Sequence, residues 1–121
     1  MAQCRRLAPV NSLIFIAGGH RVRPPDGLEL QTIAADAHCI SVACLMWQDG
    51  ETLVGLGDAL DLQRPEVPAF DGMLETPDQT VLVSTVEREV ILEQKVPDTR
   101  TRVRLWINSP SEPDEVVIGL G

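Results

Sequence analysis

Apolar and polar side chains alternate along most of the carboxyl-terminal half of the chain, in short runs separated by Pro, Asp and Gly. Successive side chains of a strand point to opposite faces, so this period of two predicts strands with one buried face. The runs are Thr80–Val86, Val90–Val96, Thr101–Asn108 and Glu115–Leu120. We therefore expect consecutive antiparallel strands in this half of the chain.

The amino-terminal half has a less regular pattern. We expect residues 1–11 to be a loosely ordered lead-in and Leu13–Ala17 to be the first strand. Several Pro and Gly residues between positions 21 and 27 favour a loop. The alternation that follows predicts a strand over Leu28–Ile33 and then a turn, although the alanines after it raise helix propensity.

The run Cys39–Trp47 is largely apolar on both faces, which is typical either of a central strand that is covered on both sides or of a strand whose outer face is lined by Trp47. Asp49 and Gly50 follow it, and this dipeptide favours the backbone conformation of a tight hairpin turn. We therefore predict that Glu51–Gly57 returns as the hairpin partner of Cys39–Trp47.

The longer connections complete the fold prediction. Two prolines interrupt Leu60–Pro68, which we expect to cross from one sheet to the other. The Pro and Asp of Thr76–Gln79 predict a type I turn that closes a second hairpin with Thr80–Val86. About eight strands without a long helix predict an all-β fold, namely a single-domain antiparallel β-sandwich or partly open barrel over residues 1–121.

Acidic side chains dominate the chain after its first 25 residues. Residues 1–25 hold four arginines and no acid, residues 26–121 hold eighteen acids and six bases, and the net charge is −8. Nucleic-acid binding depends on cationic side chains that displace condensed counterions, so this charge argues against direct DNA or RNA binding. The acidity either keeps the protein dispersed or forms a face that docks a basic protein.

The three cysteines, Cys4, Cys39 and Cys44, are an odd number without paired spacing. Such cysteines fit a reducing compartment, so we expect a cytoplasmic protein. Two arginines precede the apolar run Leu13–Ala17, but this run is shorter than the apolar core of a signal peptide. No stretch approaches the roughly 18 apolar residues of a membrane span, and we expect no membrane association.

Residues that perform catalysis or bind metal do not form a recognisable set. His38, Cys39 and Cys44 are a candidate metal group, but their spacing matches no zinc motif. Ser41, Ser84 and Cys44 lie in predicted strands, and no G-x-S-x-G elbow exposes a nucleophile. We therefore expect no enzymatic activity, no catalytic residue, no metal and no cofactor.

An outward-facing trio in the run Thr101–Asn108 is the best argument for a binding surface. If Val103, Leu105 and Ile107 face the core, the outward side chains are Arg102, Arg104 and Trp106. Arg and Trp are enriched among residues that contribute most to interface free energy. Alternatively, the arginines pair across the sheet with nearby acids and the tryptophan covers the sheet edge. Those acids are Glu87, Glu89 and Glu93.

The turn before the last strand is acidic, with Glu112, Asp114 and Glu115 close together. Such a loop would complement a basic protein partner and steer its approach at long range. A rival interpretation is a small-molecule site in which Trp47 and Trp106 form stacking walls. The sequence leaves the oligomeric state open, with a homo-oligomer as one alternative.

Strand and turn patterns in the carboxyl-terminal half resemble those of a known family. The patterns are Val67-Pro68-x-Phe70, Gly72, Val83–Glu87, Val96-Pro97, Arg102–Trp106 and Glu115–Ile118. In these patterns the chain is similar to the competence protein J family of small bacterial β-sandwich proteins, which includes a nuclease inhibitor and suspected toxin-immunity proteins. The resemblance implies a bacterial, non-enzymatic protein that masks a basic nuclease or toxin, and it transfers no binding residue.

Overall fold

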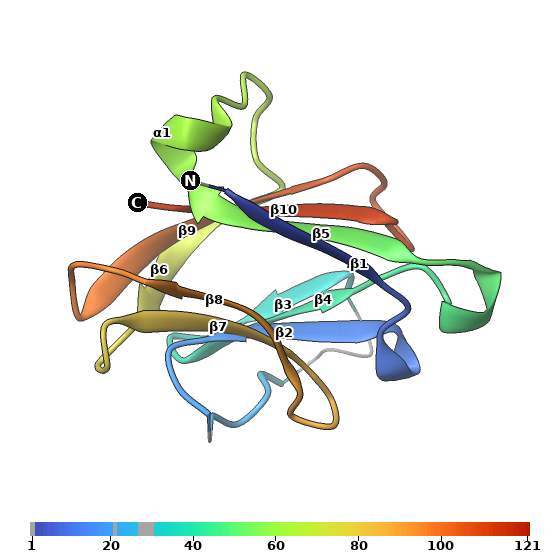
Figure 1. Ribbon diagram of the computed structural model, residues 1–121, viewed down its shortest axis with the longest axis horizontal. Helices are drawn as coiled ribbons and strands as arrows, with labels where there is room; N and C mark the ends of the chain where they lie inside the picture. The colour runs from blue at the N-terminus through green and yellow to red at the C-terminus, as the bar shows by residue number, and fades with distance from the viewer. Residues whose placement is uncertain (1, 21, 27–30) are drawn as a thin grey trace.

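Two five-stranded β-sheets face each other in the computed structural model, which describes residues 2–20, 22–26 and 31–121 (Figure 1). Sheet A has the strand order β1-β5-β10-β9-β6, and sheet B has the order β3-β4-β2-β7-β8. The strands are β1 (Gln3–Leu7), β2 (Leu13–Ala17), β3 (Ile33–Ala35), β4 (Cys39–Ala43), β5 (Thr52–Asp58), β6 (Phe70–Glu75), β7 (Thr80–Thr85), β8 (Val90–Lys95), β9 (Arg100–Ile107) and β10 (Glu115–Leu120). The predicted all-β sandwich is confirmed, with more strands than the sequence suggests.

The pairing in sheet A brings the ends of three strands together at one end of the sandwich. β5 and β10 run parallel, with Asp58 opposite Leu120. β10 and β9 run antiparallel, with Val103 opposite Leu120. The carboxyl ends of β5 and β10 therefore lie beside the start of β9, where the chain has just crossed over from β8 in sheet B.

Aliphatic side chains from the inward faces of both sheets form the core. Val103 and Leu105 are 0% exposed, and Ile107 packs against the core, which confirms the predicted inward positions of this strand. β10 buries Val116, Ile118 and Leu120 in the same way. Full burial of each such side chain contributes roughly 1.5–3 kcal/mol, which is enough to fix the face that each strand turns inward.

β4 is covered on both faces. It lies between β3 and β2, and Cys39, Ile40, Ser41 and Val42 are each at most 2% exposed. The prediction of a central strand is confirmed, although the strand ends at Ala43.

The amino-terminal residues are more ordered than the sequence predicts. We expected a loosely ordered lead-in over residues 1–11, but β1 pairs with β5 from Gln3 opposite Leu56 to Leu7 opposite Thr52. Four of its five residues are exposed, so backbone pairing holds this edge strand without an apolar pattern that would reveal it. Much of the predicted strand over Leu28–Ile33 falls outside the described residues, and β3 begins at its end.

The predicted hairpin at Asp49 and Gly50 is wrong. β4 belongs to sheet B and β5 to sheet A, so the two strands do not pair. The 3-10 turn η2 (Trp47–Asp49) and Gly50 connect them, and Gly50 has φ 146° and ψ −168°, which differs from a tight hairpin turn. The glycine here redirects the chain from one sheet to the other.

Two further connections also differ from the prediction. A turn forms at Thr76–Gln79, where the Gln79 amide donates to the Thr76 carbonyl at 2.9 Å, but it links β6 in sheet A to β7 in sheet B and closes no hairpin. Residues 60–68 do not change sheets, because β5 and β6 both belong to sheet A. Since β10 and β9 lie between these strands, the connection must pass over the outward face of sheet A.

Candidate functional site

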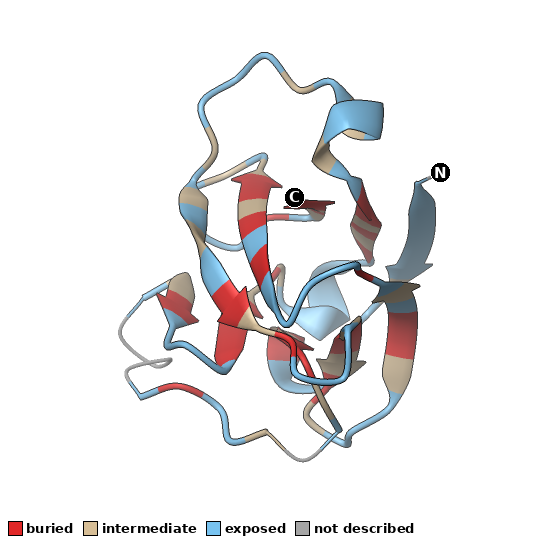
Figure 2. Ribbon diagram, turned by 90° about the vertical axis from the view of Figure 1, so that its left-hand side faces the viewer, coloured by how far each residue is buried: buried red, intermediate tan, exposed pale blue. Residues whose placement is uncertain are grey.

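Residues 59–69, which we call the β5–β6 connection, extend over the outward face of sheet A and are mostly exposed (Figure 2). The connection begins with the short helix α1 (Ala59–Leu62). It ends where the Ala69 amide donates to the Leu105 carbonyl of β9 at 2.7 Å. We distinguish its α1 half, residues 59–62, from its return half, residues 64–69.

Trp106 fastens the return half to sheet A. Its indole N–H donates to the Glu66 carbonyl at 2.9 Å, and the residue is only 8% exposed. The ring lies against Gly119 of β10, where a Cβ atom would come within 2.8 Å of the ring carbon Cζ3. Arg64 adds ion pairs at 3.5 Å to Glu115 and 3.6 Å to Glu66. Trp106 faces outward, as predicted, but the connection covers it.

The two predicted arginines are held by partners on or beside sheet A. Arg102 donates to both carboxylate oxygens of Asp71 on β6, at 2.9 and 2.6 Å. This hydrogen-bonded pair lowers the pKa of the Asp71 carboxyl and raises the pKa of Arg102. Arg104 donates to the Gly121 carbonyl at 2.6 Å.

The expected pairing of these arginines with Glu87, Glu89 or Glu93 is wrong. Those acids belong to β8 and to the β7–β8 turn of sheet B, whereas the strand beside β9 is β6. β6 lies beside β9, and its register places Asp71 opposite Arg104 and diagonal to Arg102. Diagonal neighbours on adjacent strands are within reach of long side chains, so Arg102 binds Asp71.

The acidic end loop lies in the β9–β10 hairpin and is internally ordered. The Asn108 side-chain carbonyl accepts from the Asp114 amide at 3.1 Å and from the Glu115 amide at 3.2 Å. The Asn108 amide group donates to the Asp114 carboxylate. Glu112 and Asp114 are exposed, whereas Glu115 is half-buried beside Arg64. These hydrogen bonds therefore fix the backbone at Asp114 and Glu115 and hold the loop in one conformation.

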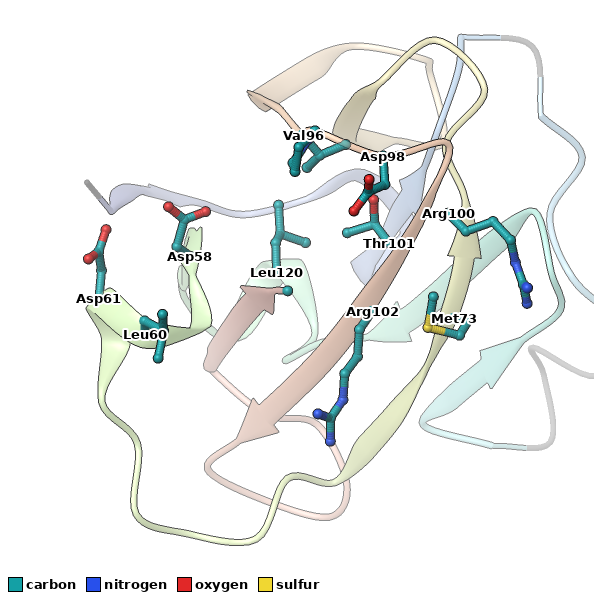
Figure 3. A pocket seen from close by; sticks show the side chains of 12 residues that line it. Asp58, Leu60, Asp61, Met73, Val96, Asp98, Arg100, Thr101, Arg102 and Leu120 are labelled. Atoms are coloured by element: carbon teal, nitrogen blue, oxygen red, sulfur yellow. The ribbon is translucent and has the colours of Figure 1, made fainter.

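A cleft of about 560 Å³ opens beside the α1 half of the connection, at the end of the sandwich where β5 and β10 finish (Figure 3). Val96 and Leu120 line its inner part, exposed Pro97 also lines it, and Leu60 and Met73 lie at its rim. Leu60 is 87% exposed and Met73 is 46% exposed. The cleft thus combines an apolar interior with exposed apolar side chains around it.

Charged groups divide the cleft into two sides. Asp58, Asp61 and Asp98 line it together with Arg100 and Arg102. In Figure 3 the two guanidinium groups point away from Asp58 and Asp98. Arg102 is engaged by Asp71, and Arg100 lies 3.7 Å from Glu75. Carboxylates therefore dominate the side formed by β5, α1 and the β8–β9 turn.

Hydrogen bonds order the β8–β9 turn that carries Asp98. The Thr76 hydroxyl lies 2.8 Å from the Asp98 carbonyl and 2.9 Å from the Thr101 hydroxyl. The Thr76 amide donates to the Thr99 carbonyl at 2.9 Å. Across the cleft, the Gln94 side-chain amide donates to the Asp58 carboxylate at 2.8 Å. The walls of the cleft are therefore positioned before any ligand arrives.

Two of the residues considered for catalysis or metal binding, Cys39 and Cys44, are buried. Burial raises the pKa of the Cys39 and Cys44 thiols to about 12, and the charge of Asp36 adds to the effect at Cys39. A thiol with so high a pKa carries little thiolate near neutral pH and is a poor nucleophile. Within the described ranges, no three His, Cys, Asp or Glu side chains gather as metal ligands.

No helix in the described ranges is long and apolar enough to cross a membrane.

The two tryptophans do not form the walls of one site. Trp47 lies in η2, is 57% exposed and neighbours Met46, which is 40% exposed. Trp106 borders a separate hollow of about 240 Å³ with Arg64 and Glu115. The sequence pattern alone did not distinguish the exposed tryptophan from the covered one.

The structure brings some of the predicted residues together and adds others. Arg102, Arg104 and Trp106 share the outward face of β9, and the Arg64–Glu115 ion pair joins this face to the acidic end loop. Sequence reasoning missed Asp58, Leu60 and Asp98, because the cleft collects them from separate segments. The available signal was an apolar residue, Leu60, between the two acids Asp58 and Asp61.

Comparisons with known proteins identify the fold. No protein-family pattern and no curated protein matches the sequence. Among solved structures, the product of crocagin biosynthetic gene J shares the fold with a TM-score of 0.50 and 10% identity, over 98% of this chain and 94% of that chain. ComJ of Bacillus subtilis, an inhibitor of the DNA-degrading activity of NucA, matches with a TM-score of 0.65 and 11% identity, over 98% of this chain and 93% of that chain. The predicted resemblance is thus confirmed in the fold: this chain is similar to ComJ along almost its whole length.

Proposed function

We propose that this chain is a non-enzymatic cytoplasmic protein that binds and inhibits a basic nuclease or toxin. The observation that carries the proposal is the fold shared over 98% of the chain with ComJ, itself an inhibitor of a nuclease. One fold can host many functions, so the shared fold does not by itself specify inhibition. The distribution of charge on sheet A supports the proposal independently.

The arginines of the β5–β6 connection and of β9 are engaged within the protein, whereas Arg5 and Arg6 on the edge strand β1 are exposed. Carboxylates are therefore in surplus around β9 and the connection, away from that edge. Arg64 pairs with Glu66 and Glu115, and Arg100 pairs with Glu75. Arg102 pairs with Asp71, and Arg104 donates to a backbone carbonyl. Asp58, Asp98, Glu112 and Asp114 have no basic partner among the described residues. Such a surface attracts a cationic protein and speeds its association.

The proposed interface runs over the outward face of sheet A, from the acidic end loop to the cleft. Glu112, Asp114 and Glu115 would steer the basic partner, and Arg102, whose side chain is 48% exposed, would contact it at the rim. Arg104 and Trp106 would support this surface from below. Inhibition would follow from steric blockade of the partner's active site, which requires no catalytic group in this chain.

The test uses a basic nuclease or toxin of the same organism, starting with one encoded beside this gene if the neighbouring reading frame specifies such an enzyme. Purified chain is mixed with that enzyme, DNA degradation is followed, and capture is compared at low and high salt. We expect stoichiometric inhibition and a complex that weakens as ionic strength rises, because salt screens exposed charges. Full nuclease activity in the presence of excess chain, with no capture at low salt, would contradict the proposal.

A second candidate function is small-molecule binding in the cleft. Its volume of about 560 Å³ lies within the range of ligand pockets, about 300–1,000 Å³, and its interior is apolar. A ligand of this kind would raise the melting temperature in a thermal-shift screen, because it binds the native state alone. A metabolite that stabilises the protein, together with failure of nuclease inhibition, would favour this function.

A further inference from the structure

We propose that the cleft between α1 and the β8–β9 turn receives an arginine or lysine side chain of the partner protein. This inference rests on the proposed function and assigns one contact of the complex to a defined place. The side chain would lay its aliphatic stem on the apolar interior and bring its cationic head to the carboxylates of Asp58 and Asp98.

The apolar interior suits the stem of a long basic side chain. Val96 and Leu120 are 7% and 3% exposed, and they form the inner part of the cleft. Arg and Lys bury their methylene groups along such surfaces while the charged head stays at the polar rim. Leu60, 87% exposed on α1, would be covered by the arriving partner.

The carboxylates at the cleft have capacity for a cation. Asp58 accepts from the neutral Gln94 amide at 2.8 Å, which leaves its negative charge without a basic neighbour in the described chain. The Asp98 carboxylate also forms no ion pair with any described residue. A charge-assisted hydrogen bond from a guanidinium or ammonium group to either carboxylate is stronger than a neutral one.

The arginines of the cleft do not exclude a cationic guest. Arg102 is bound through two hydrogen bonds to Asp71, and Arg100 lies 3.7 Å from Glu75, so each positive charge has a local counter-charge. Both guanidinium groups point away from Asp58 and Asp98 in Figure 3. The charge distribution therefore favours a basic side chain on the carboxylate side of the cleft.

The experiment uses two short peptides as probes, one with arginines spaced by alanines and the other with citrulline, the neutral isostere, at the same positions. Each is titrated into the full ¹⁵N-labelled chain, and amide shifts are mapped. We expect the arginine peptide to shift the amides of Asp58, Val96 and Leu120, and the citrulline peptide to leave them unchanged. Equal shifts with both peptides, or arginine-induced shifts spread evenly over all acidic loops, would overturn the assignment.

Matched variants locate the contact. Asp58→Asn combined with Asp98→Asn removes two charges, and the asparagine at position 58 keeps an oxygen that can accept from Gln94. Glu87→Gln combined with Glu89→Gln removes the same charge from exposed positions of the β7–β8 turn in sheet B, outside the proposed interface. We expect the first pair to weaken peptide binding at least tenfold and the second to change it less than twofold. The reverse order would overturn the assignment, and thermal melts establish that each variant is folded.

Nuclease inhibition separates this inference from the proposed function. If the arginine peptide binds the cleft but the chain inhibits no nuclease, the proposed function fails and the cleft remains a site for basic side chains. If inhibition succeeds but the peptide leaves the cleft amides unchanged and the cleft variant inhibits normally, the assignment alone fails.

Discussion

The two halves of the β5–β6 connection cover the same sheet but differ in how they are held. The return half is fastened by the Trp106 indole, which donates to Glu66, and by Arg64, which pairs with Glu115. The α1 half borders the cleft and exposes Leu60. The α1 half also contacts β10, since Leu62 Cδ1 would lie 3.4 Å from a Cβ atom on Gly119, but it leaves the cleft beside it open. An exposed apolar side chain next to a cleft is available to a partner, whereas a covered tryptophan contributes to stability.

The strongest test of this comparison is Trp106→Ala. We expect the free energy of unfolding to fall by about 3–5 kcal/mol, because the substitution leaves a cavity and removes the anchor of the return half. Urea unfolding measures the loss. The control is Leu60→Ala in the α1 half, which should change stability by less than about 0.5 kcal/mol. Similar losses for the two variants would show that the halves are held alike.

A smaller loss of stability is expected for Gly119→Ala. The added Cβ would come within 2.8 Å of Trp106 Cζ3, so the ring must shift and its hydrogen bond to Glu66 must weaken. Overpacking of this kind costs about 1–3 kcal/mol. Gly55→Ala is the matched control on the neighbouring strand, since a Cβ there meets its nearest atom at 3.8 Å. A melting temperature unchanged by Gly119→Ala would argue against a tightly seated ring.

Binding of the partner should depend more on the α1 half of the connection than on the return half. Leu60→Ala should weaken the proposed complex about tenfold, or about 1.4 kcal/mol, because it removes an apolar contact beside the cleft. Val67→Ala in the return half is the matched control, since Val67 is 91% exposed but lies away from the cleft. Titration calorimetry with the nuclease measures both, and an equal effect at the two positions would remove the distinction.

The acidic end loop should affect the rate of association more than the final affinity. Glu112→Gln with Asp114→Asn should slow association several-fold at low salt, because these exposed charges attract the partner at long range. The difference should vanish at high salt, where the charges are screened. Stopped-flow mixing at two ionic strengths measures the effect. A rate that is independent of salt would point to an uncharged encounter.

The smallest effect is expected at the Asp71–Arg102 pair. Arg102 lowers the pKa of Asp71 below its ordinary value of 3.8, so the stabilisation is present above that value and is lost as the pH falls through the lower folded pKa. In Asp71→Asn, the free energy of unfolding should therefore fall less between pH 7 and pH 3 than it does in the unmodified chain. Urea unfolding at the two pH values measures this difference. Asp78→Asn, at an exposed acid without an ion pair in the described chain, is the control. Identical acid profiles for Asp71→Asn and the unmodified chain would show that the pair contributes nothing.

The candidate site was only partly predictable from the sequence. Alternation along Thr101–Asn108 correctly placed Arg102, Arg104 and Trp106 on the outward face. It could not show that Trp106 is covered, because the covering residue, Glu66, is 40 positions away in the chain. The cleft was missed because it draws side chains from β5, α1, the β8–β9 turn and β10, which no local pattern connects.

Alternation and turn residues determined much of what is local in this protein: the strands with one buried face, the faces that they bury and positions at which the chain bends. The exposed edge strand β1 carried no such pattern. Neither signal could determine which strands pair. Asp49-Gly50 and Thr76–Gln79 both lie where the chain bends, yet the strands on either side of each belong to different sheets. A turn constrains only a few backbone angles, whereas the choice of partner strand depends on which arrangement buries all the apolar faces together. Tertiary structure alone therefore decided the sheet order, the cover over Trp106 and the cleft beside α1.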